Sequence, residues 1–538
     1  RTTAAVMDFQ QGIGKRLQKQ LEMLDRSTST SYLHELMEDS YLEYRLPLPV
    51  NKNPVLLASP VLATSKLSFA RFAATIISNT LRFYLKIKRR ELAPDLDVYR
   101  KISNPLCMVQ YDNLFGTSRI PGIKRDSFRR TENSEHVVVI RRNVFYALHL
   151  IKGEKLPTVE QIEQQLDWIL ANTPLGEPAV GALTGLPRTH WSVVRSYMSN
   201  LSPVNARSLE LLDTALFIVC LDEKTPTGPE STLSNAFHGD GRNRWFDKPI
   251  QLIFTPNGQW AINMEHTGHD GYPMMRFLSE VNRELEDHNS SPIPCELPMR
   301  LQWNLSEGLL EEIEQASATV DSLIAQHEVR VLEFNEFGSD WLAQRGLVAD
   351  AVLQIAIQLA YVRLHGQITC ISEVVHTRNF QYGRFETTRT VTPESLELIK
   401  TFSETTSSDQ TRYSLLKRAV GAHLLRLFDC KRGNYVQRHL FALHTLARSQ
   451  GVTADIFQDK VYTEVFCQPV VCSSSLPAGM GCEVSCSILL VSHGYTVVYL
   501  IDRERIVLSV MSKNRQAGDF IELLKRSLLD LRSILLNY

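Results

Sequence analysis

The sequence predicts an α/β or α+β fold built from two domains. Segments with the two-residue period of β-strands alternate with segments with the 3.6-residue period of helices throughout the chain, which is typical of mixed folds. A chain of 538 residues is too long for one ordinary hydrophobic core, so we expect two domains of a few hundred residues each. Apolar residues make up 43% and charged residues 22% of the chain, as in a soluble globular enzyme or scaffold protein.

The clearest strands are expected in the first half of the chain. Residues 135–151 contain two β-rich runs around a turn. Residues 252–265 contain two more runs, separated by the pair Asn257-Gly258, and Asn-Gly is the strongest short signal for a β-hairpin. Alternation along the second run predicts that one core receives the side chains of Trp260, Ile262 and Met264.

Helices are predicted mainly in the second half. The spacing of apolar residues in 309–327 and 348–366 is that of amphipathic helices. Residues 392–402 begin with a Thr followed by Pro, a typical helix start. Residues 485–502 are predicted to form a hairpin that turns at His493-Gly494.

Two stretches rich in turn residues predict linkers, at 223–235 and 286–298. We place the domain boundary at the second one, which divides the chain into residues 1–298 and 299–538. Some elements are free to exchange between the halves.

Charge and cysteine content exclude several classes of protein. The net charge is −1, and the basic cluster of a nucleic-acid-binding surface is missing from the sequence. Nine cysteines, an odd number without a C-x-x-C pair, indicate a reducing compartment, so we expect a cytoplasmic protein. No apolar run reaches the roughly 18 residues of a membrane span. The chain begins with Arg1 and not with Met, which suggests a piece of a longer polypeptide.

His266 is the first candidate for catalysis because it follows a predicted strand and its neutral imidazole can act as a general base. Asp270 lies four residues further on, and Gly271 permits a sharp turn. A His-x-x-x-Asp pattern is nevertheless common by chance. The pair His266 and His269 also fits a metal site, but no third ligand follows at a suitable spacing, so we expect no metal.

Eight short motifs place these residues in a wider pattern. Each motif alone is weak, but all eight in this order resemble the choline/carnitine O-acyltransferase family over most of the chain. They are YRLPLPVNKNP (44–54), PLCMVQYDNLFGTSRIPG (105–122), NRWFDK (243–248), EHTGHDG (265–271), QLAYVRLHGQ (358–367), YGRFETTRT (382–390), QRHLFALHTLA (437–447) and SSS (473–475).

The resemblance implies a fold and a mechanism. It implies two similar chloramphenicol-acetyltransferase-like domains, with mixed sheets flanked by helices and an active-site tunnel between them. His266 would deprotonate an alcohol, which attacks a thioester without a covalent acyl-enzyme. Asp270 would hold the loop by pairing with Arg384. Ser475 would stabilise the oxyanion, although an ordinary turn would also explain this run of serines.

The resemblance fails at the residues expected to bind coenzyme A. The family has two lysines before the QLAY helix, and Ser339 and Ala343 occupy those positions here. The cations that would meet the nucleotide phosphates are therefore missing. Ser485 is small where some short-chain relatives have Met, which would leave room for a long acyl chain.

The acceptor residues are altered as well. Ser372 and Phe385 occupy the positions of a Tyr and a Thr that bind the carnitine carboxylate in the family. Ser487 occupies the position of an aromatic residue near the trimethylammonium group, whose cation–π attraction of about 1–2 kcal/mol would be lost. Arg438 matches the arginine for the carboxylate, and Ser473 is a further substrate-binding candidate.

These changes suggest that the acyl group arrives on the phosphopantetheine arm of an acyl carrier protein in the same polypeptide. The acceptor would be an uncharged alcohol or polyol, and the product an ester, in a reversible transesterification. The pattern resembles the C-terminal domains of some fungal highly reducing polyketide synthases. No cofactor would be bound permanently.

Two alternatives remain open. The first is a conventional carnitine O-acyltransferase that uses acyl-coenzyme A and binds its substrates through other residues. The second is a non-catalytic module that docks a carrier protein. The sequence does not identify the acyl chain, the alcohol, the favoured direction or the oligomeric state.

Overall fold

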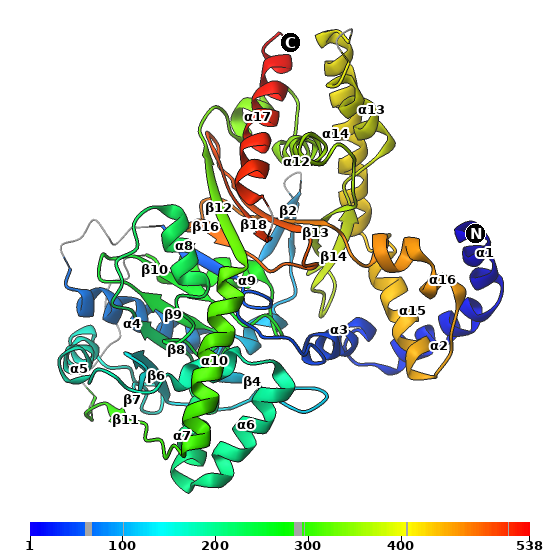
Figure 1. Cartoon of the computed structure of the whole chain (residues 1–538). Coiled ribbons are helices and arrows are strands. Elements are labelled where there is room, and N and C mark those ends of the chain that lie inside the picture. Colours follow the sequence, from blue (N-terminus) through cyan, green and yellow to red (C-terminus); the bar gives the residue numbers. More distant parts are fainter. Residues whose placement is uncertain are drawn as a thin grey trace.

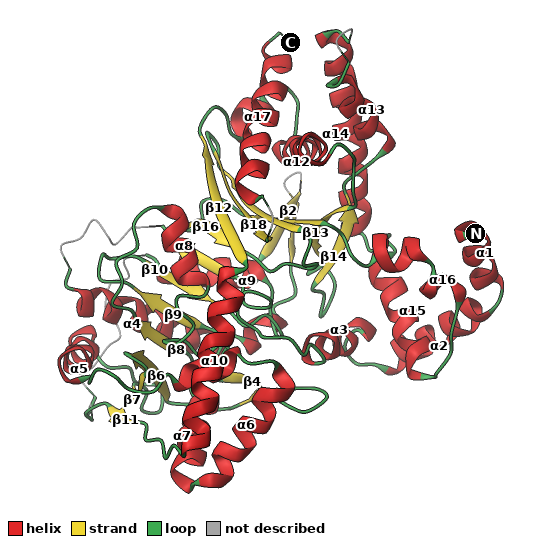
Figure 2. Ribbon diagram, viewed as in Figure 1, coloured by secondary structure: helices red, strands yellow, loops and turns green. Residues whose placement is uncertain are grey.

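The computed structural model describes residues 1–59, 67–99, 102–283, 293–294, 296–404, 407–514 and 516–537. It contains two large mixed β-sheets with helices packed around them, which confirms the predicted α/β class (Figures 1 and 2). None of the helices in these ranges is long and apolar enough to span a membrane.

The first sheet has eight strands and is built mainly from the N-terminal half. Its two parallel pairs are β6–β8 and β8–β9, and its other pairs are antiparallel. In spatial order the strands are β11 (Met299–Arg300), β7 (Val144–His149), β6 (His136–Arg141), β8 (Ile218–Leu221), β9 (Gln251–Phe254), β10 (Trp260–Asn263), β1 (Val55–Ala58) and β16 (Cys482–Cys486).

Helices cover both faces of this sheet, because its strands are apolar on both sides. Val137 and Val139 in β6 belong to the core on one face, and Val138 and Ile140 belong to the core on the other. The first core includes α4 (Phe69–Lys88), α5 (Val159–Asn172) and α9 (Gly271–Val281). The second includes α6 (Arg188–Leu201), α7 (Pro203–Thr214) and α10 (Glu307–Ala325).

The second sheet has six strands from the C-terminal half. Their order is β12 (His327–Phe334), β18 (Ile506–Lys513), β17 (Tyr495–Ile501), β15 (Val471–Leu476), β13 (Ile371–His376) and β14 (Phe385–Arg389). One core is shared with α12 (Ala349–His365), α13 (Pro393–Thr401), α14 (Asp409–Lys431) and α17 (Ala517–Leu536). A further core joins β12 and β18 to β1, β16 and α8 (Pro229–Phe237), so the two sheets pack against each other there.

The predicted hairpin at 485–502 is wrong. β16 pairs with β1 in the first sheet, whereas β17 pairs with β15 and β18 in the second. The chain therefore crosses from one sheet to the other between Cys486 and Tyr495. Alternation of apolar residues identifies a strand but not its partner, which explains the error.

The hairpins β6–β7 and β9–β10 are present as predicted, and Trp260, Ile262 and Met264 share one core. Helices α10, α12 and α13 lie within two residues of their predicted limits at each end. The linker prediction for 223–235 is wrong in part, because Pro229 occupies the first turn of α8. Residues 286–292 and 295 of the second linker lie outside the described ranges, and the boundary at 298 stays a prediction.

A group of helices from both ends of the chain forms a third region, on the right in Figure 1. Its core includes Phe9, Leu17, Leu443 and Phe457, so the N-terminal helices pack on the C-terminal half. The helices are α1 (Thr2–Gln11), α2 (Ile13–Ser27), α3 (Tyr32–Leu42), α15 (Gln437–Ser449) and α16 (Asp455–Gln458). The remaining short elements are β2 (Leu96–Tyr99), β3 (Ile102–Pro105), η1 (Val109–Asn113), β4 (Thr117–Ile120), β5 (Ser127–Arg130), η2 (Val180–Gly185), α11 (Ser339–Ala343) and η3 (Val461–Phe466).

Candidate active site

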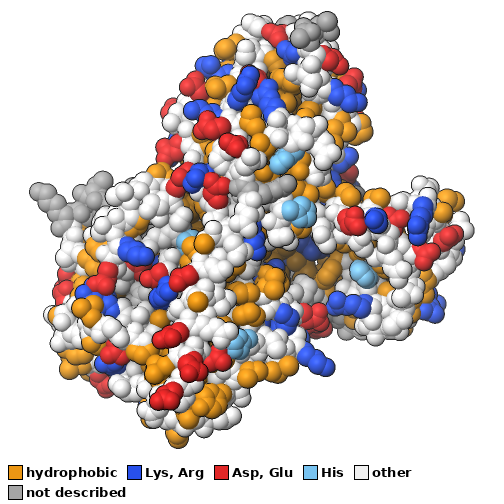
Figure 3. All heavy atoms as spheres, in the orientation of Figure 1, with side chains coloured by type: hydrophobic (Ala, Val, Ile, Leu, Met, Phe, Trp, Pro, Cys, Tyr) orange, Lys and Arg blue, Asp and Glu red, His pale blue; other side chains and the backbone are white. Residues whose placement is uncertain are grey.

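A cavity of about 610 Å³ is lined by residues from both sheets and from α3. Figure 3 shows the surface hollowed where the two sheet regions and the helical group meet, with hydrophobic side chains in the recess. His266 lines the cavity from the first sheet, and Ser475 lines it from the second. Candidate residues from distant parts of the chain therefore share one space.

His266 lies in the loop between β10 and α9, three residues after the strand ends. Its neighbour Glu265 is buried and accepts hydrogen bonds from the backbone N–H of Thr267 at 3.1 Å and from the Thr267 hydroxyl at 2.6 Å. Glu265 also forms an ion pair with buried Arg119, at 3.0 Å. These contacts fix the loop on the side away from the cavity.

The ion pair extends into a chain of buried charges. Asp126 accepts from Nε of both Arg119 and Arg188 at 2.7 Å. Arg188 also donates to Asp247 at 2.6 Å, and the other Asp247 oxygen accepts from the Trp191 indole at 2.7 Å. Removal of one charge would leave an uncompensated ion in the interior, so this network is expected to stabilise the loop strongly.

Arg384, just before β14, holds the other side of the loop. Its guanidinium pairs with Asp270 at 2.9 Å and 3.2 Å. It also donates to the backbone carbonyls of Thr267, His266 (2.9 Å) and His269 (3.2 Å). One side chain from the second sheet thus fixes the loop that extends from the first.

Asp270 is ionised at neutral pH. Burial raises the pKa of its carboxyl group, but the positive charge of Arg384, the adjacent His266 ring and a hydrogen bond from Gln110 (2.9 Å) outweigh burial and lower it to about 2. Gln110, in η1, also accepts from the Asp270 backbone N–H at 2.8 Å. Asp270 is therefore a fixed negative charge beside the imidazole.

The His266 ring stacks on the Tyr41 ring, with 5.6 Å between centroids and an angle of 16°. Burial lowers the pKa of the imidazole, Asp270 opposes that effect, and Arg384 adds to it. A ring with a lowered pKa is neutral at pH 7, as a general base must be.

The ring nitrogens of His266 have different surroundings. Nδ1 lies 3.7 Å from the Asp270 carboxylate and is close to its own backbone carbonyl. These two acceptors favour a proton on Nδ1, although Arg384 is 3.3 Å from the same nitrogen. Within the described ranges Nε2 has no protein hydrogen-bond partner, so it is the nitrogen that can accept a substrate proton.

The two candidate serines of β15, Ser473 and Ser475, differ in whether their hydroxyl groups are already hydrogen-bonded within the protein. Ser473 is buried, accepts from Gln354 at 2.9 Å and donates to the Ser372 carbonyl at 3.0 Å, so its hydroxyl is already used within the protein. Ser475 is exposed to the cavity. Of the two, Ser475 has the freer hydroxyl for a reacting oxygen.

A family model described as "Choline/Carnitine o-acyltransferase" matches residues 1–526. The chain belongs to the choline/carnitine O-acyltransferase family. It is therefore an acyltransferase. The Columba livia carnitine O-acetyltransferase is 30% identical over 99% of this chain and 88% of its own length. The Drosophila melanogaster choline O-acetyltransferase is 28% identical over 100% of this chain and 84% of its own.

The solved structures that are similar to this chain include the first condensation domain of the CDA synthetase. It aligns with 93% of this chain and 95% of its own at 14% identity, with a TM-score of 0.39. This similarity is too low to support an argument about function.

Most candidate substrate residues of this acyltransferase line the cavity. They are Ser372, Phe385, Arg438, Ser473, Ser485 and Ser487. Ser485 donates to the Val55 carbonyl at 2.7 Å, which holds its small side chain against β1. Ser339 and Ala343, by contrast, lie in α11 and do not line this cavity.

Arg438 is a half-buried cation that forms no ion pair within the described ranges, although the Glu386 carboxylate accepts from its backbone N–H at 3.1 Å. Its Nε donates to the Phe385 carbonyl at 3.1 Å, and its guanidinium lies 4.4 Å from the centre of the Phe385 ring. No described carboxylate lies within ion-pair distance of it, and burial lowers its pKa. An electron-rich substrate oxygen would suit this position.

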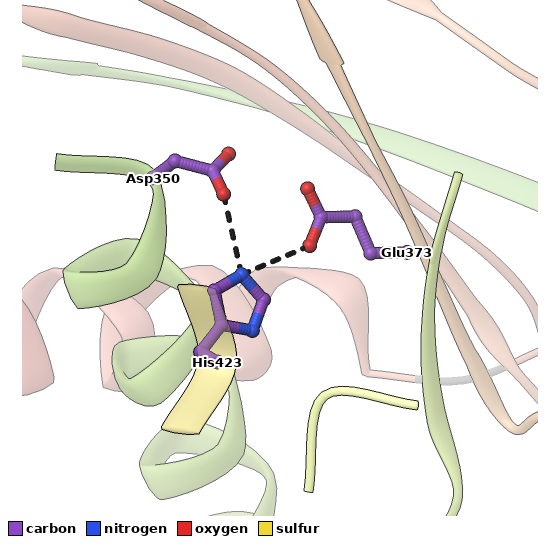
Figure 4. Close-up of side chains that lie close together, drawn as sticks. All are labelled: Asp350, Glu373 and His423. Carbon is purple, nitrogen blue, oxygen red and sulfur yellow. Dashed lines mark hydrogen bonds and ion pairs between the residues drawn. The ribbon is translucent and has the colours of Figure 1, made fainter. Parts of the chain in front are cut away.

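Sequence reasoning missed a charged triad in the wall of the cavity. His423 Nε2 lies 3.4 Å from Asp350 and 3.2 Å from Glu373 (Figure 4). Burial lowers the pKa of His423, but the two carboxylates raise it overall to about 9; burial and Asp350 raise the pKa of Glu373. The Tyr499 hydroxyl donates to Asp350 at 2.7 Å.

The ligand atoms of this triad lie within 4.8 Å of one another, as a metal site requires. A protonated imidazole nevertheless offsets one of the two carboxylate charges without a metal, and the raised pKa of Glu373 reduces the other. The three residues come from α12, β13 and α14, so sequence spacing gave no signal. Tyr41 and Lys52, also in the cavity wall, were missed although they lie in or beside the first motif.

Proposed function

We propose that this protein transfers an acyl group from a thioester to an alcohol, with His266 as general base. Nε2 removes the hydroxyl proton, and the oxygen attacks the thioester carbonyl. The tetrahedral oxyanion accepts a hydrogen bond from Ser475. The C–S bond then breaks, and the thiolate takes the proton back from Nε2. The observation that supports this sequence best is a neutral imidazole with one free nitrogen, fixed by Asp270 and Arg384 at the cavity.

The test is His266→Ala, assayed with octanoyl thioesters of coenzyme A and of a carrier protein. We expect the turnover rate to fall by about 10²–10⁴-fold, the usual contribution of a positioned acid–base. The control is His190→Ala, which removes a partly exposed His paired with Glu312 outside the cavity lining, and should retain the wild-type rate. If His266→Ala retains the wild-type rate, the proposal is wrong.

The relatives favour conventional substrates. Two relatives that align over nearly the whole chain are named as carnitine and choline O-acetyltransferases. Arg438 lines the cavity and its guanidinium forms no ion pair within the described ranges, so it suits an acceptor with a carboxylate. On this basis the protein would transfer an acyl group from coenzyme A to carnitine.

Other residues favour a carrier protein as donor and an uncharged alcohol or polyol as acceptor. Ser339 and Ala343 provide no cation for nucleotide phosphates. Ser372 and Phe385 replace two hydroxyl-bearing residues that the family resemblance implies for carnitine. A polyketide synthase context, a carrier in the same polypeptide and a cytoplasmic location are parts of this hypothesis.

A substrate matrix separates the two hypotheses. Octanoyl-coenzyme A and octanoyl carrier protein are each tested with carnitine and with glycerol. Efficient transfer from coenzyme A to carnitine would reject the carrier and polyol hypothesis. Efficient transfer from the carrier to glycerol, with little use of carnitine, would reject the conventional one.

A further inference from the structure

Lys52 is a cation in the cavity wall that the acyl transfer described above does not use. It lies in a turn just before β1, and its backbone N–H donates to the Leu48 carbonyl at 2.7 Å. Val50 in the same turn is buried and has a φ of 66°, a conformation that is strained for a β-branched residue. Such strain is tolerated where it places a functional group.

The ammonium group of Lys52 lies against two aromatic rings. Nζ is 5.3 Å from the centre of the Tyr41 ring and 4.6 Å from that of Tyr44. Tyr41 is the ring that stacks on His266. Lys52 is therefore separated from the catalytic base by a single aromatic ring.

No acidic side chain in the described ranges forms an ion pair with Lys52, and none of their polar groups hydrogen-bonds its Nζ. The nearby carboxylate of Glu265 is already paired with Arg119. Burial and the charge of Arg119 lower the pKa of Lys52 to about 8, against the opposing effect of Glu265. The amine is thus mostly protonated at pH 7, with three N–H donors and no protein acceptor.

The remaining charges of the cavity do not compensate for Lys52. Asp270 is paired with Arg384. His423 offsets one of the two carboxylate charges of Asp350 and Glu373, and neither carboxylate forms an ion pair with Lys52. Arg438 is a further cation without an ion pair. A positively charged acceptor would therefore meet uncompensated positive charge near the base.

We infer that Lys52 determines acceptor specificity: it donates to a hydroxyl or carboxylate oxygen of the acceptor and excludes a quaternary ammonium. The exclusion has two causes. The charges repel, and the aromatic rings that a trimethylammonium group would use are already covered, Tyr44 by Lys52 and Tyr41 by Lys52 and by Arg384, 4.9 Å from its centre. This inference rests on the proposed function, because it assumes that the acceptor approaches His266 through this cavity.

The experiment compares the wild type with Lys52→Met, Lys52→Ala and the charge-preserving control Lys52→Arg. Each is assayed with glycerol, glycerate and choline as acceptors and with the better octanoyl donor. We expect kcat/KM for choline relative to glycerol to rise by about tenfold or more in Lys52→Met. It should rise further in Lys52→Ala, which uncovers the Tyr44 ring while Arg384 still covers Tyr41. Lys52→Arg should stay close to the wild type.

Calorimetry with choline and glycerate gives the same comparison without turnover. Weaker glycerate binding and stronger choline binding by Lys52→Met than by the wild type would support the inference. An unchanged choline-to-glycerol ratio and unchanged binding would overturn it, even if His266-dependent acyl transfer is intact. A uniform fall of kcat for all acceptors would also overturn it, because Lys52 would then act on the thioester. Loss of all transfer in the wild type would instead reject the proposed function.

Discussion

The two sides of the cavity differ in how their charges are balanced. Behind the His266 loop, Glu265, Asp126 and Asp247 are each paired with a buried arginine. On the substrate side, the cations Lys52 and Arg438 form no ion pair with any described residue. The hydroxyl of Thr387, also on that side, is buried without a hydrogen-bond partner there.

This difference separates two tasks. A network of paired charges has its lowest free energy without a ligand, so it keeps the base in place. Unpaired donors and cations are costly when they are buried, and a ligand that supplies their partners gains that free energy. The first region therefore fixes the chemistry, and the second selects the substrate. Variants on each side of the cavity can test this division.

Asp270→Asn should lower kcat by about a hundredfold, the cost of a poorly positioned catalytic group. Arg384 would lose its ionic partner, and KM should change much less. The charge of Asp270 raises the pKa of His266, so its removal should also shift the acid limb of kcat/KM to lower pH. A variant with wild-type kcat and an unshifted pH profile would show that this contact has no catalytic importance.

Asp126→Asn should destabilise the fold by about 3–5 kcal/mol, the usual cost of breaking a buried ion pair. Arg119 and Arg188 would both lose a counter-charge. Chemical denaturation measures this effect. The control is Asp39→Asn, which removes an exposed ion pair with Arg125 and should cost less than about 1 kcal/mol. Equal losses of unfolding free energy in both variants would contradict the conclusion that the buried network stabilises the fold.

The surroundings of Asp270 and Asp126 also show which functional residues could be predicted from the sequence. His266, Asp270 and Arg384 were predicted because they lie in short motifs, and the structure brings them into contact. Asp126 and Arg188 were not predicted, since only the folded chain places them beside Arg119. The members of the triad Asp350, Glu373 and His423 are likewise far apart in the sequence.

For the fold, local periodicity predicted the α/β class and the helices α10, α12 and α13. It did not predict the exchange of β16 into the first sheet, because pairing partners depend on long-range packing. Lys52 was missed for a related reason. A lysine in a turn usually points to solvent, and its burial here depends on Tyr41 and Tyr44 from a separate helix and its following residues.

The folded-state pKa of Asp270 predicts how stability depends on pH. A pKa of about 2, against the ordinary value of 3.8, contributes about 2 kcal/mol of stability at neutral pH. Because the folded pKa is the lower one, this contribution is present above pH 4 and is lost as the pH falls toward 2. The difference in unfolding free energy between the wild type and Asp270→Asn should shrink over that range. A constant difference would contradict the ionised state of Asp270.

The smallest expected effect concerns α11, which does not line the cavity. The double substitution Ser339→Lys and Ala343→Lys introduces the two cations that the family resemblance implies for binding coenzyme A. We expect KM for octanoyl-coenzyme A to fall about threefold relative to octanoyl-pantetheine, because an exposed ion pair contributes under 1 kcal/mol. The gain should disappear at high salt. The matched control, Gln315→Lys with Ala318→Lys in α10, adds the same charge elsewhere and should leave the ratio unchanged. If neither variant changes the ratio, α11 does not face the donor, and the missing lysines no longer support a carrier protein over coenzyme A.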